Sequence, residues 1–234
     1  MARNWPIYLY VPNLIGYARI LANIVAFGVC FTNKKLFASL YLISFICDEL
    51  DGRFARMLDQ CSTFGAVLDM VTDRVSTAGL LVVLSHLYRS YFGLFLGLLV
   101  LDIASHWLQM YSTFLSSKTS HKDVEDSKSM LLRAYYRYRL FMGYCCVGAE
   151  VLYLVLYLLS NAHSGNISEV VLSALNEGSF LAMLGLLALP GCIIKQIVNF
   201  VQMKTAADLC VKFDIQRSSK STCKLGKLEV FFLW

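Results

Sequence analysis

The chain has little charge for its length. Only 16% of its 234 residues are Asp, Glu, Lys or Arg, whereas 57% are hydrophobic. An ordinary soluble domain carries roughly a quarter charged residues, so the composition argues against a typical soluble enzyme. Several runs approach the roughly 18 to 20 apolar residues that cross a hydrocarbon core. The sequence therefore predicts an all-α integral membrane protein in contact with membrane lipids.

The eight cysteines lack any pairing pattern. They form no CxxC pair and no cluster with histidine, which argues against both a disulfide framework and a zinc site. Most lie in apolar runs, where free cysteine acts as a small packing residue. The net charge of +5 comes without a basic stripe interleaved with aromatics. We therefore expect no nucleic-acid partner and attribute the excess charge to basic flanks of membrane helices.

Internal repeats and low-complexity linkers are also absent, which favours one helical bundle over an array of domains. The apolar runs predict six transmembrane helices. We place them at residues 13–32, 36–57, 64–88, 91–115, 139–160 and 174–203.

Lys and Arg are scarce on one side of this bundle. The outer side carries only Lys34, Lys35 and Arg89 if the N-terminus lies inside. The inner side then holds Arg3, the basic residues near Arg53 to Arg74, six between Lys118 and Arg139, and six between Lys204 and Lys227. Cytoplasmic loops are enriched in Lys and Arg, so we expect a multi-pass protein with both termini in the cytosol. The sequon at Asn166 would then lie on the opposite side.

Acidic residues interrupt the apolar sequence between Cys47 and Arg74. Asp48 and Asp51 share one face of the second predicted helix, and Asp69 and Asp73 share one face of the third, because neighbours three or four apart lie together. Two antiparallel helices with a short connection bring all four to a similar depth on the cytoplasmic side. An aspartate near the bilayer centre costs roughly 2.5 to 3.5 kcal/mol, so this cluster needs a compensating charge.

Two kinds of compensation fit these residues. The arginines Arg53, Arg56 and Arg74 could pair with the acids in a purely structural arrangement. Mg²⁺ or Mn²⁺ suits carboxylate oxygens better, and two such ions could clamp a transferring phosphoryl group. The second interpretation predicts phosphate chemistry at the membrane surface.

Other membrane proteins also use intramembrane acids. A divalent-cation transporter usually shows repeated halves or broken helices around its site, and the sequence has neither signal. A membrane prenyltransferase binds Mg²⁺ through aspartates but would leave Gly52, Ala55, Arg56 and Gly65 unexplained.

The motif Asp48-x-x-Asp51-Gly52-x-x-Ala55-Arg56, followed after eight residues by Gly65-x-x-x-Asp69-x-x-x-Asp73, resembles the complete signature of the CDP-alcohol phosphotransferase family. The resemblance implies a six-helix membrane enzyme in which an alcohol displaces CMP from a CDP-linked substrate with the help of two divalent metal ions, Mn²⁺ or Mg²⁺. It implies that Asp48, Asp51, Asp69 and Asp73 bind metal and that Asp73 is also the general base. Gly52, Ala55, Arg56 and Gly65 would bind the nucleotide and diphosphate.

Further stretches resemble the eukaryotic members of this family that use inositol. They are residues 11–20, 68–74, 101–107, 120–122 and 132–136, together with Arg139. This resemblance implies CDP-diacylglycerol and myo-inositol as substrates, CMP as a product, a homodimer and a location in the endoplasmic reticulum. Other acceptors of the family remain open, namely glycerol 3-phosphate, serine, choline and ethanolamine.

The same resemblance implies roles for residues outside the motif. Asn13 and Arg19 would line the CDP-diacylglycerol site, although Arg19 could instead extend to the membrane interface. The inositol pocket would be formed by Asp102, His106, Arg133, Tyr136 and Arg139. Asp102 and His106 could equally form a buried hydrogen-bonded pair, and the basic residues a solvated flank near anionic lipids.

The resemblance ends near the C-terminus. We expect residues 1–205 to form the membrane domain and residues 206–234 to form a divergent cytoplasmic tail.

Overall fold

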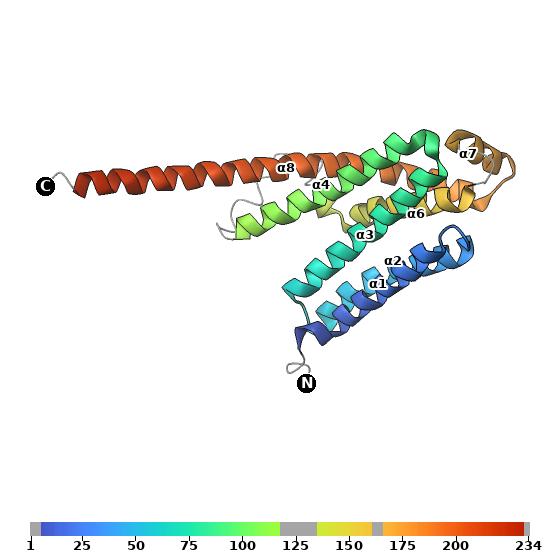
Figure 1. Cartoon of the computed structure of the whole chain (residues 1–234), viewed down its shortest axis with the longest axis horizontal. Helices are drawn as coiled ribbons and strands as arrows, with labels where there is room; N and C mark the ends of the chain where they lie inside the picture. The colour runs from blue at the N-terminus through green and yellow to red at the C-terminus, as the bar shows by residue number, and fades with distance from the viewer. Residues whose placement is uncertain (1–5, 118–134, 161–165, 232–234) are drawn as a thin grey trace. The chain divides into compact units, whose positions relative to one another are not determined.

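Helices make up every regular element in the described part of the chain, which confirms the predicted all-α class (Figure 1). A computed structural model describes residues 6–117, 135–160 and 166–231. The elements are η1 (Ile7–Leu9), α1 (Val11–Val29), α2 (Lys34–Met57), α3 (Thr63–Leu87), η2 (Arg89–Tyr91), α4 (Phe92–Ser117), α6 (Arg139–Leu159), α7 (Ile167–Asn176) and α8 (Phe180–Phe231).

Among the described residues, four helical segments are long and apolar enough to cross a membrane. These are Val11–Val29, Arg89–Leu115, Arg139–Leu159 and Phe180–Ser218. The chain is therefore a multi-pass membrane protein. The helices α2 and α3 have 24 and 25 residues, enough to span a bilayer, but they carry the acidic motif and are less apolar. A total of six spans stays a prediction.

The predicted sixth span is wrong in its start. Residues 174–203 were expected to form one helix, but α7 ends at Asn176 and α8 begins at Phe180. Gly178 between them has a φ of +69°, the left-handed conformation that commonly ends a helix at glycine. From Phe180 the helix continues without interruption to Phe231, about 78 Å at 1.5 Å per residue.

Local signals fix the turn between α2 and α3. Ser62 caps α3 by accepting a hydrogen bond from the backbone N–H of Gly65 at 3.0 Å. Asp59 adopts a φ of +53°, a conformation that aspartate tolerates better than most side chains. Gln60 Oε1 then accepts a hydrogen bond from the N–H of Val11 at 2.8 Å, which ties the start of α1 to this turn.

The chain divides into two compact units. The first comprises residues 1–99 and 148–189, and the second comprises residues 100–147 and 190–234. Each is described by itself.

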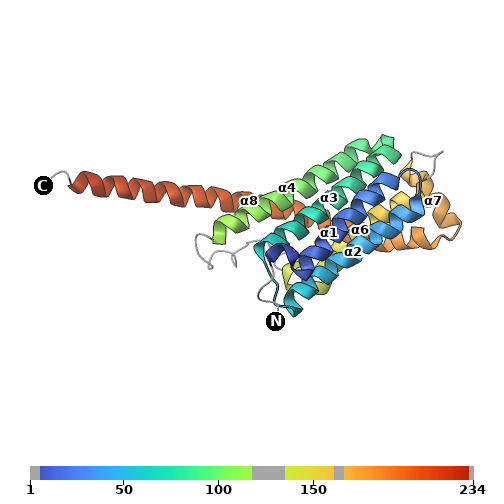
Figure 2. The ribbon, with the colours of Figure 1, turned by 60° about the horizontal axis from the view of Figure 1, so that its bottom comes forward.

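In the first unit, α1, α2 and α3 lie side by side (Figure 2). The helices α1 and α3 run in the same direction and α2 runs antiparallel to both. An aromatic layer formed by Phe27, Phe37, Tyr41 and Tyr157 fills the space between α1, α2 and α6, with Phe37 and Tyr157 ring centres 4.4 Å apart. This layer lies near the end of the helices opposite the acids, because Phe27 is close to the end of α1 and Phe37 is close to the start of α2.

Hydrogen bonds close the end opposite the acids. Lys34 at the start of α2 donates to the backbone carbonyl and, at 2.7 Å, to the hydroxyl of Ser160 after α6. Tyr157 donates to the carbonyl of Cys30 at 2.6 Å. Asn166, in the sequon, caps α7 and accepts a hydrogen bond from Tyr91 at 2.8 Å. The α2 and α6 ends are thereby held together.

The second unit has its own core of Tyr135, Cys145 and Val198. The ammonium group of Lys195 on α8 lies 5.9 Å from the centre of the Tyr135 ring. An aromatic face attracts such a cation, which offsets part of the cost of burying Lys195.

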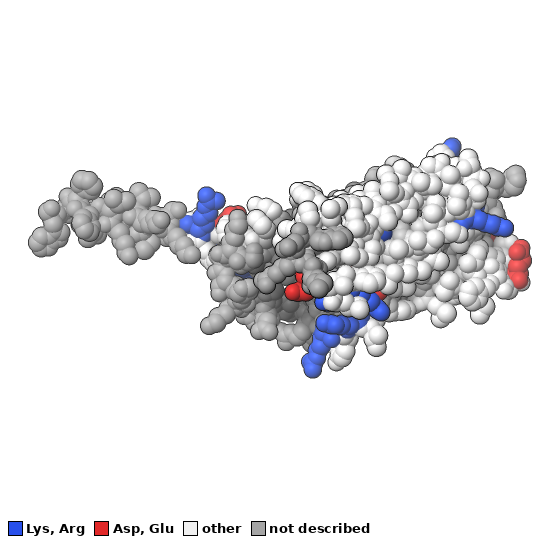
Figure 3. Space-filling model, turned by 90° about the horizontal axis from the view of Figure 1, so that it is seen from below, with Lys and Arg blue, Asp and Glu red and all other residues white. Residues whose placement is uncertain are grey.

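The surface view in Figure 3 shows a largely uncharged face with Lys, Arg, Asp and Glu gathered at its margins, as a membrane protein requires.

Candidate active site

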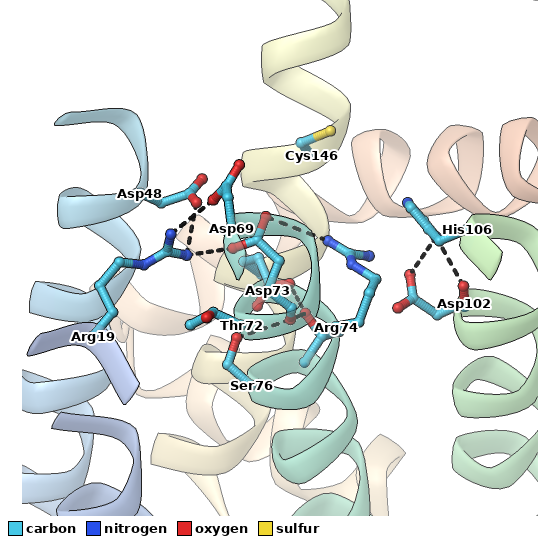
Figure 4. Close-up of polar contacts among 12 residues, drawn as sticks. Arg19, Asp48, Asp69, Thr72, Asp73, Arg74, Ser76, Asp102, His106 and Cys146 are labelled. Carbon is cyan, nitrogen blue, oxygen red and sulfur yellow. Dashed lines mark hydrogen bonds and ion pairs between the residues drawn. The ribbon is translucent and has the colours of Figure 1, made fainter. Parts of the chain in front are cut away.

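The four motif aspartates converge on one arginine. Asp48 and Asp51 belong to α2, Asp69 and Asp73 belong to α3, and Arg19 belongs to α1. Figure 4 shows Arg19 directed toward Asp48, Asp69 and Asp73. The Arg19 guanidinium nitrogens lie 2.7 Å from Asp48, 2.8 Å from Asp51 and 2.8 Å from Asp69, and they also pair with Asp73. The helix periodicity that predicted a shared face on each helix is therefore consistent with the structure.

Arg19 is the counterion that the sequence did not identify. Its side chain is 2% exposed, so it does not extend to the membrane interface. Of the arginines expected to compensate the acids, Arg74 lies 3.8 Å from Asp73, whereas Arg53 pairs with Glu49. A charged residue inside the first apolar span indicated that Arg19 needs a partner. The sequence did not show which partner, because that depends on which face of α1 packs against α2 and α3.

The cluster retains an excess of negative charge. If all six side chains are ionised, four carboxylates exceed the guanidinium groups of Arg19 and Arg74 by two charges within this group. Asp48 Oδ1 is buried and pairs with the Arg19 guanidinium at 2.7 Å. The remaining excess of negative charge favours a further positive partner.

The donor set fits a divalent metal ion. Asp48, Asp51 and Asp69 each offer a carboxylate oxygen, and these three atoms lie within 4.8 Å of one another. Clusters made only of carboxylate oxygens suit hard cations such as Mg²⁺ and Mn²⁺. The residues present can therefore hold such an ion. Because Arg19 pairs with the same carboxylates, it would have to share these oxygens with the ion or release some of them.

A cavity of about 200 Å³ adjoins the acids. Its lining includes two of the aspartates and most of the residues predicted to bind the CDP-linked substrate. These are Asn13, Asp51, Gly52, Ala55, Arg56, Gly65 and Asp69. Arg19, expected in the same lining, lies within the acidic cluster instead.

Two glycines of the motif line this cavity. A Cβ atom on Gly65 would stand 2.8 Å from Asn13 Oδ1 and 3.0 Å from the capping hydroxyl of Ser62, closer than side chains tolerate. A Cβ atom on Gly52 would stand 3.6 Å from the guanidinium of Arg56, which is an ordinary contact distance. Only Gly65 is therefore required by close packing, since it allows α1 to approach α3.

The predicted inositol residues lie in the second unit. On α4, His106 Nδ1 donates to the backbone carbonyl of Asp102 at 2.8 Å and lies 3.6 Å from its carboxylate (Figure 4). Because a carbonyl only accepts, this contact places a proton on Nδ1. Asp102 is 7% exposed, so this contact is mostly buried. The contact uses Nδ1 of His106 and leaves Nε2 outside it.

Tyr136 precedes α6, and Arg139 is its first residue. The hydroxyl of Tyr136 accepts a hydrogen bond from Gln202 on α8 at 2.6 Å, and Arg139 is exposed. The neighbouring Tyr135 is nearly inaccessible, and burial raises the pKa of its hydroxyl above the ordinary value. Arg133 lies outside the described residues. A common inositol pocket formed by these residues stays a prediction.

Comparisons with known proteins decide the family. The CDP-alcohol phosphatidyltransferase family matches residues 9–207. The chain belongs to this family.

Curated relatives of this CDP-alcohol phosphatidyltransferase cover nearly its whole length. It is similar to the Arabidopsis thaliana protein named "Probable CDP-diacylglycerol--inositol 3-phosphatidyltransferase 2", with 60% identity over 94% of this chain and 99% of the relative. It is 37% identical to the CDP-diacylglycerol--inositol 3-phosphatidyltransferase of Saccharomyces cerevisiae, covering 90% of each. The human protein of that name is 38% identical over 86% of this chain and 91% of its own length. No solved structure matches.

Membership of the CDP-alcohol phosphatidyltransferase family identifies the chain as a transferase of phospholipid biosynthesis. It favours this activity over the cation transporter and the prenyltransferase that intramembrane acids alone left open. The structure adds the contacts of Arg19, which the motif does not contain.

Proposed function

We propose that this enzyme transfers the phosphatidyl group of CDP-diacylglycerol to myo-inositol and releases CMP. The observation that carries the proposal is the convergence of four motif aspartates beside a cavity lined by the remaining motif residues. The names of relatives that cover almost the whole chain support inositol as the acceptor.

In the proposed reaction, an inositol hydroxyl attacks the phosphorus that carries diacylglycerol. The new O–P bond forms as the bond to the CMP oxygen breaks, and Asp73 takes the hydroxyl proton. Asp73 is given this role by its place in the family motif, and its side chain lies in the acidic cluster with 29% of its surface exposed. General-base catalysis of this kind contributes roughly 10²- to 10⁴-fold to the rate.

Other residues would bind and orient the substrate. Arg56 and the backbone at Gly52 and Gly65 line the cavity, where they can contact the diphosphate and cytidine. Asn13 is 2% exposed and donates to the carbonyl of Ile7 at 2.6 Å, which fixes its side chain at the cavity wall. We assign two roles to Arg19. It fixes the positions of the four aspartates, and it contributes to the substrate site.

We further propose that Asp48, Asp51, Asp69 and Asp73 hold Mn²⁺ or Mg²⁺, with two ions in the complete site. Bound metal would neutralise negative charge on the diphosphate and the departing CMP. The support is the oxygen-only donor set and its excess of negative charge.

For inositol we propose a polar pocket that includes Asp102, His106, Arg133, Tyr136 and Arg139. The closely spaced Asp102 and His106 on α4 supply both an acceptor and a ring nitrogen for hydroxyl groups.

Purified protein should discriminate among alcohols offered with CDP-diacylglycerol. Incorporation of glycerol 3-phosphate or serine in place of inositol would contradict the proposed acceptor while leaving the family intact.

The proposed enzyme is a six-span homodimer of the endoplasmic reticulum with its active site and both termini facing the cytosol. This orientation gives water-soluble inositol and CMP access to the acidic end of α2 and α3. The distribution of Lys and Arg supports it. Residues 1–205 would form the membrane domain and residues 206–234 the cytosolic tail.

Replacing Asp73 tests the proposed base. Asp73→Asn should lower turnover by about 100-fold or more, because the amide cannot take the proton, and should retain CDP-diacylglycerol binding. The measurements are inositol incorporation into lipid and binding of CDP-diacylglycerol to purified protein. Asp59→Asn in the α2–α3 turn is the matched control and should keep activity. Undiminished incorporation in Asp73→Asn would rule out its role as the base.

A further inference from the structure

A carboxyl group outside the acidic cluster connects three helices of the first unit. Tyr41 on α2 donates a hydrogen bond to Glu150 Oε2 on α6 at 2.7 Å. Glu150 Oε1 lies 2.6 Å from the hydroxyl of Thr77 on α3. Tyr41 and Thr77 are each 4% exposed. An acidic residue within a membrane helix is costly unless it is well paired, so this three-helix contact is a candidate for a specific role.

The contact leads to Asp73 within one helical turn. The Thr77 hydroxyl lies 3.0 Å from the backbone carbonyl oxygen of Asp73 as well as 2.6 Å from Glu150. On α2, Tyr41 precedes Asp48 by seven residues, which places both on the same helix face. Glu150 is therefore connected to the turn that carries Asp73 and to the face of α2 that carries Asp48.

The Thr77 hydroxyl lies near two hydrogen-bond acceptors. The Thr77 hydroxyl has one proton, whereas the Asp73 carbonyl and Glu150 Oε1 both lie within hydrogen-bonding distance of it. Thr77 is the donor in both contacts, so its proton is shared between the Asp73 carbonyl and Glu150 Oε1, while Glu150 Oε2 accepts the hydrogen bond from Tyr41. A glutamine at position 150 can accept from Tyr41 through its oxygen and donate from its amide group to the Thr77 hydroxyl, which leaves the Thr77 proton for the Asp73 carbonyl.

We propose that Glu150 is a positioning residue for the transferase reaction. Through Thr77 and Tyr41 it fixes α3 against α2, so that the carboxylate of Asp73 keeps its place beside the other acids. This inference rests on the proposed function. Glu150 does not touch the reacting groups, and its effect reaches them through the turn at Asp73.

Removing the contact should affect turnover more than substrate binding. In Glu150→Leu, kcat should fall by roughly 10- to 100-fold, because small displacements of a reacting group are costly. The KM for CDP-diacylglycerol should change little, since the cavity residues lie on other turns of the helices. Glu150→Gln should restore kcat to near the wild-type value.

Thr77→Val tests the connection to Asp73. Its loss of kcat should resemble that of Glu150→Leu, and the double variant should lose little more, because both remove one connected contact. Glu177→Leu, at the exposed end of α7, is the matched control and should keep the wild-type kcat. Thermal unfolding of each purified variant shows whether a fall in kcat merely follows a loss of folded protein.

An unchanged kcat in Glu150→Leu would overturn the proposal, as would a loss explained by unfolding alone. A Glu150→Gln variant as impaired as Glu150→Leu would also overturn it. The wild-type assay tests the proposed function separately. If the wild type used another alcohol in place of inositol, the proposed acceptor would be wrong, and the same variants assayed with that alcohol would still test Glu150.

Discussion

At the scale of single residues, Arg19 has the most demanding position. One guanidinium group contacts carboxylates from two helices, and its side chain is almost completely buried. Guanidinium is suited to this arrangement because its planar fork presents five N–H donors. Lysine would offer a compact charge with a different donor geometry. Arg19 thus links the position of α1 to the positions of the acids on α2 and α3.

Removing Arg19 should destabilise the fold most when divalent metal is absent. Arg19→Met leaves the acids without their main counterion. Only Asp51 among them is buried, so the loss should be smaller than the about 3 to 5 kcal/mol of a fully buried pair. Thermal unfolding in detergent with a chelator should therefore occur at a lower temperature than for the wild type. Added Mn²⁺ or Mg²⁺ should reverse part of the loss, because the ion supplies positive charge at the same carboxylates.

The exposed pair between Arg53 and Glu49 provides the control for this experiment. Both side chains are more than 60% exposed, and such pairs contribute about 0 to 1 kcal/mol. Arg53→Met should unfold near the wild-type temperature with or without metal. An Arg19→Met protein as stable as the wild type in chelator would contradict the role of Arg19 as counterion.

The sequence allowed the acids to be grouped but not their counterion to be chosen. Helix periodicity places Asp48 with Asp51 and Asp69 with Asp73, whatever the tertiary structure. The partner of Arg19 depends instead on the rotation of α1 against two other helices, which its periodicity does not determine. Glu150 is the only acid between residues 139 and 160, so the sequence indicates that it needs a polar partner within the membrane. Its partners Tyr41 and Thr77 follow only from the packing of the helices.

At the scale of helices, hydrophobic length predicted most elements and missed one break. The predicted spans 36–57, 64–88 and 91–115 agree closely with α2, α3 and α4. The error near residue 178 arose because a hydropathy average does not detect a change in backbone direction at one glycine. The segment Asn176 to Ser179 nevertheless carries a helix-ending signal, since glycine is favoured just after a helix end.

Helix contact in the first unit depends on a glycine away from the motif. A Cβ atom on Gly79 of α3 would lie 2.5 Å from the Phe27 ring of α1, so Gly79→Ala requires that ring to move. Phe27 also contacts the rings of Phe37 and Tyr41, which limits its movement. We expect a loss of about 1 to 3 kcal/mol, measured as a lower unfolding temperature in detergent.

A glycine with open space provides the matched substitution. Nothing lies within 4 Å of the corresponding position at Gly93 in α4. Gly93→Ala should be neutral or slightly stabilising, because alanine favours the helix by roughly 0.5 to 1 kcal/mol relative to glycine. Equal unfolding temperatures for the two alanine variants would show that the α1–α3 contact does not depend on Gly79.

At the scale of the whole molecule, the sequence supports the membrane class more directly than the arrangement of the parts. Composition alone predicted a multi-pass helical protein because polar backbone in lipid must be satisfied within helices. The two compact units could not be predicted, since α4, α6 and α8 each contribute residues to both. Membrane orientation likewise depends on the loops, so it requires a measurement on the intact protein.

Cys61 offers that measurement because it is exposed in the α2–α3 turn and lines the cavity beside the acids. In sealed endoplasmic reticulum vesicles with the cytosolic face outward, a membrane-impermeant maleimide should label Cys61 without detergent. CDP-diacylglycerol supplied with Mg²⁺ should slow this labelling, since the lipid nucleotide would occupy the cavity. Cys61→Ser serves as the control and should lack that protected signal. Labelling of Cys61 only after detergent opens the vesicles would place the acidic end on the luminal side and contradict the proposed topology.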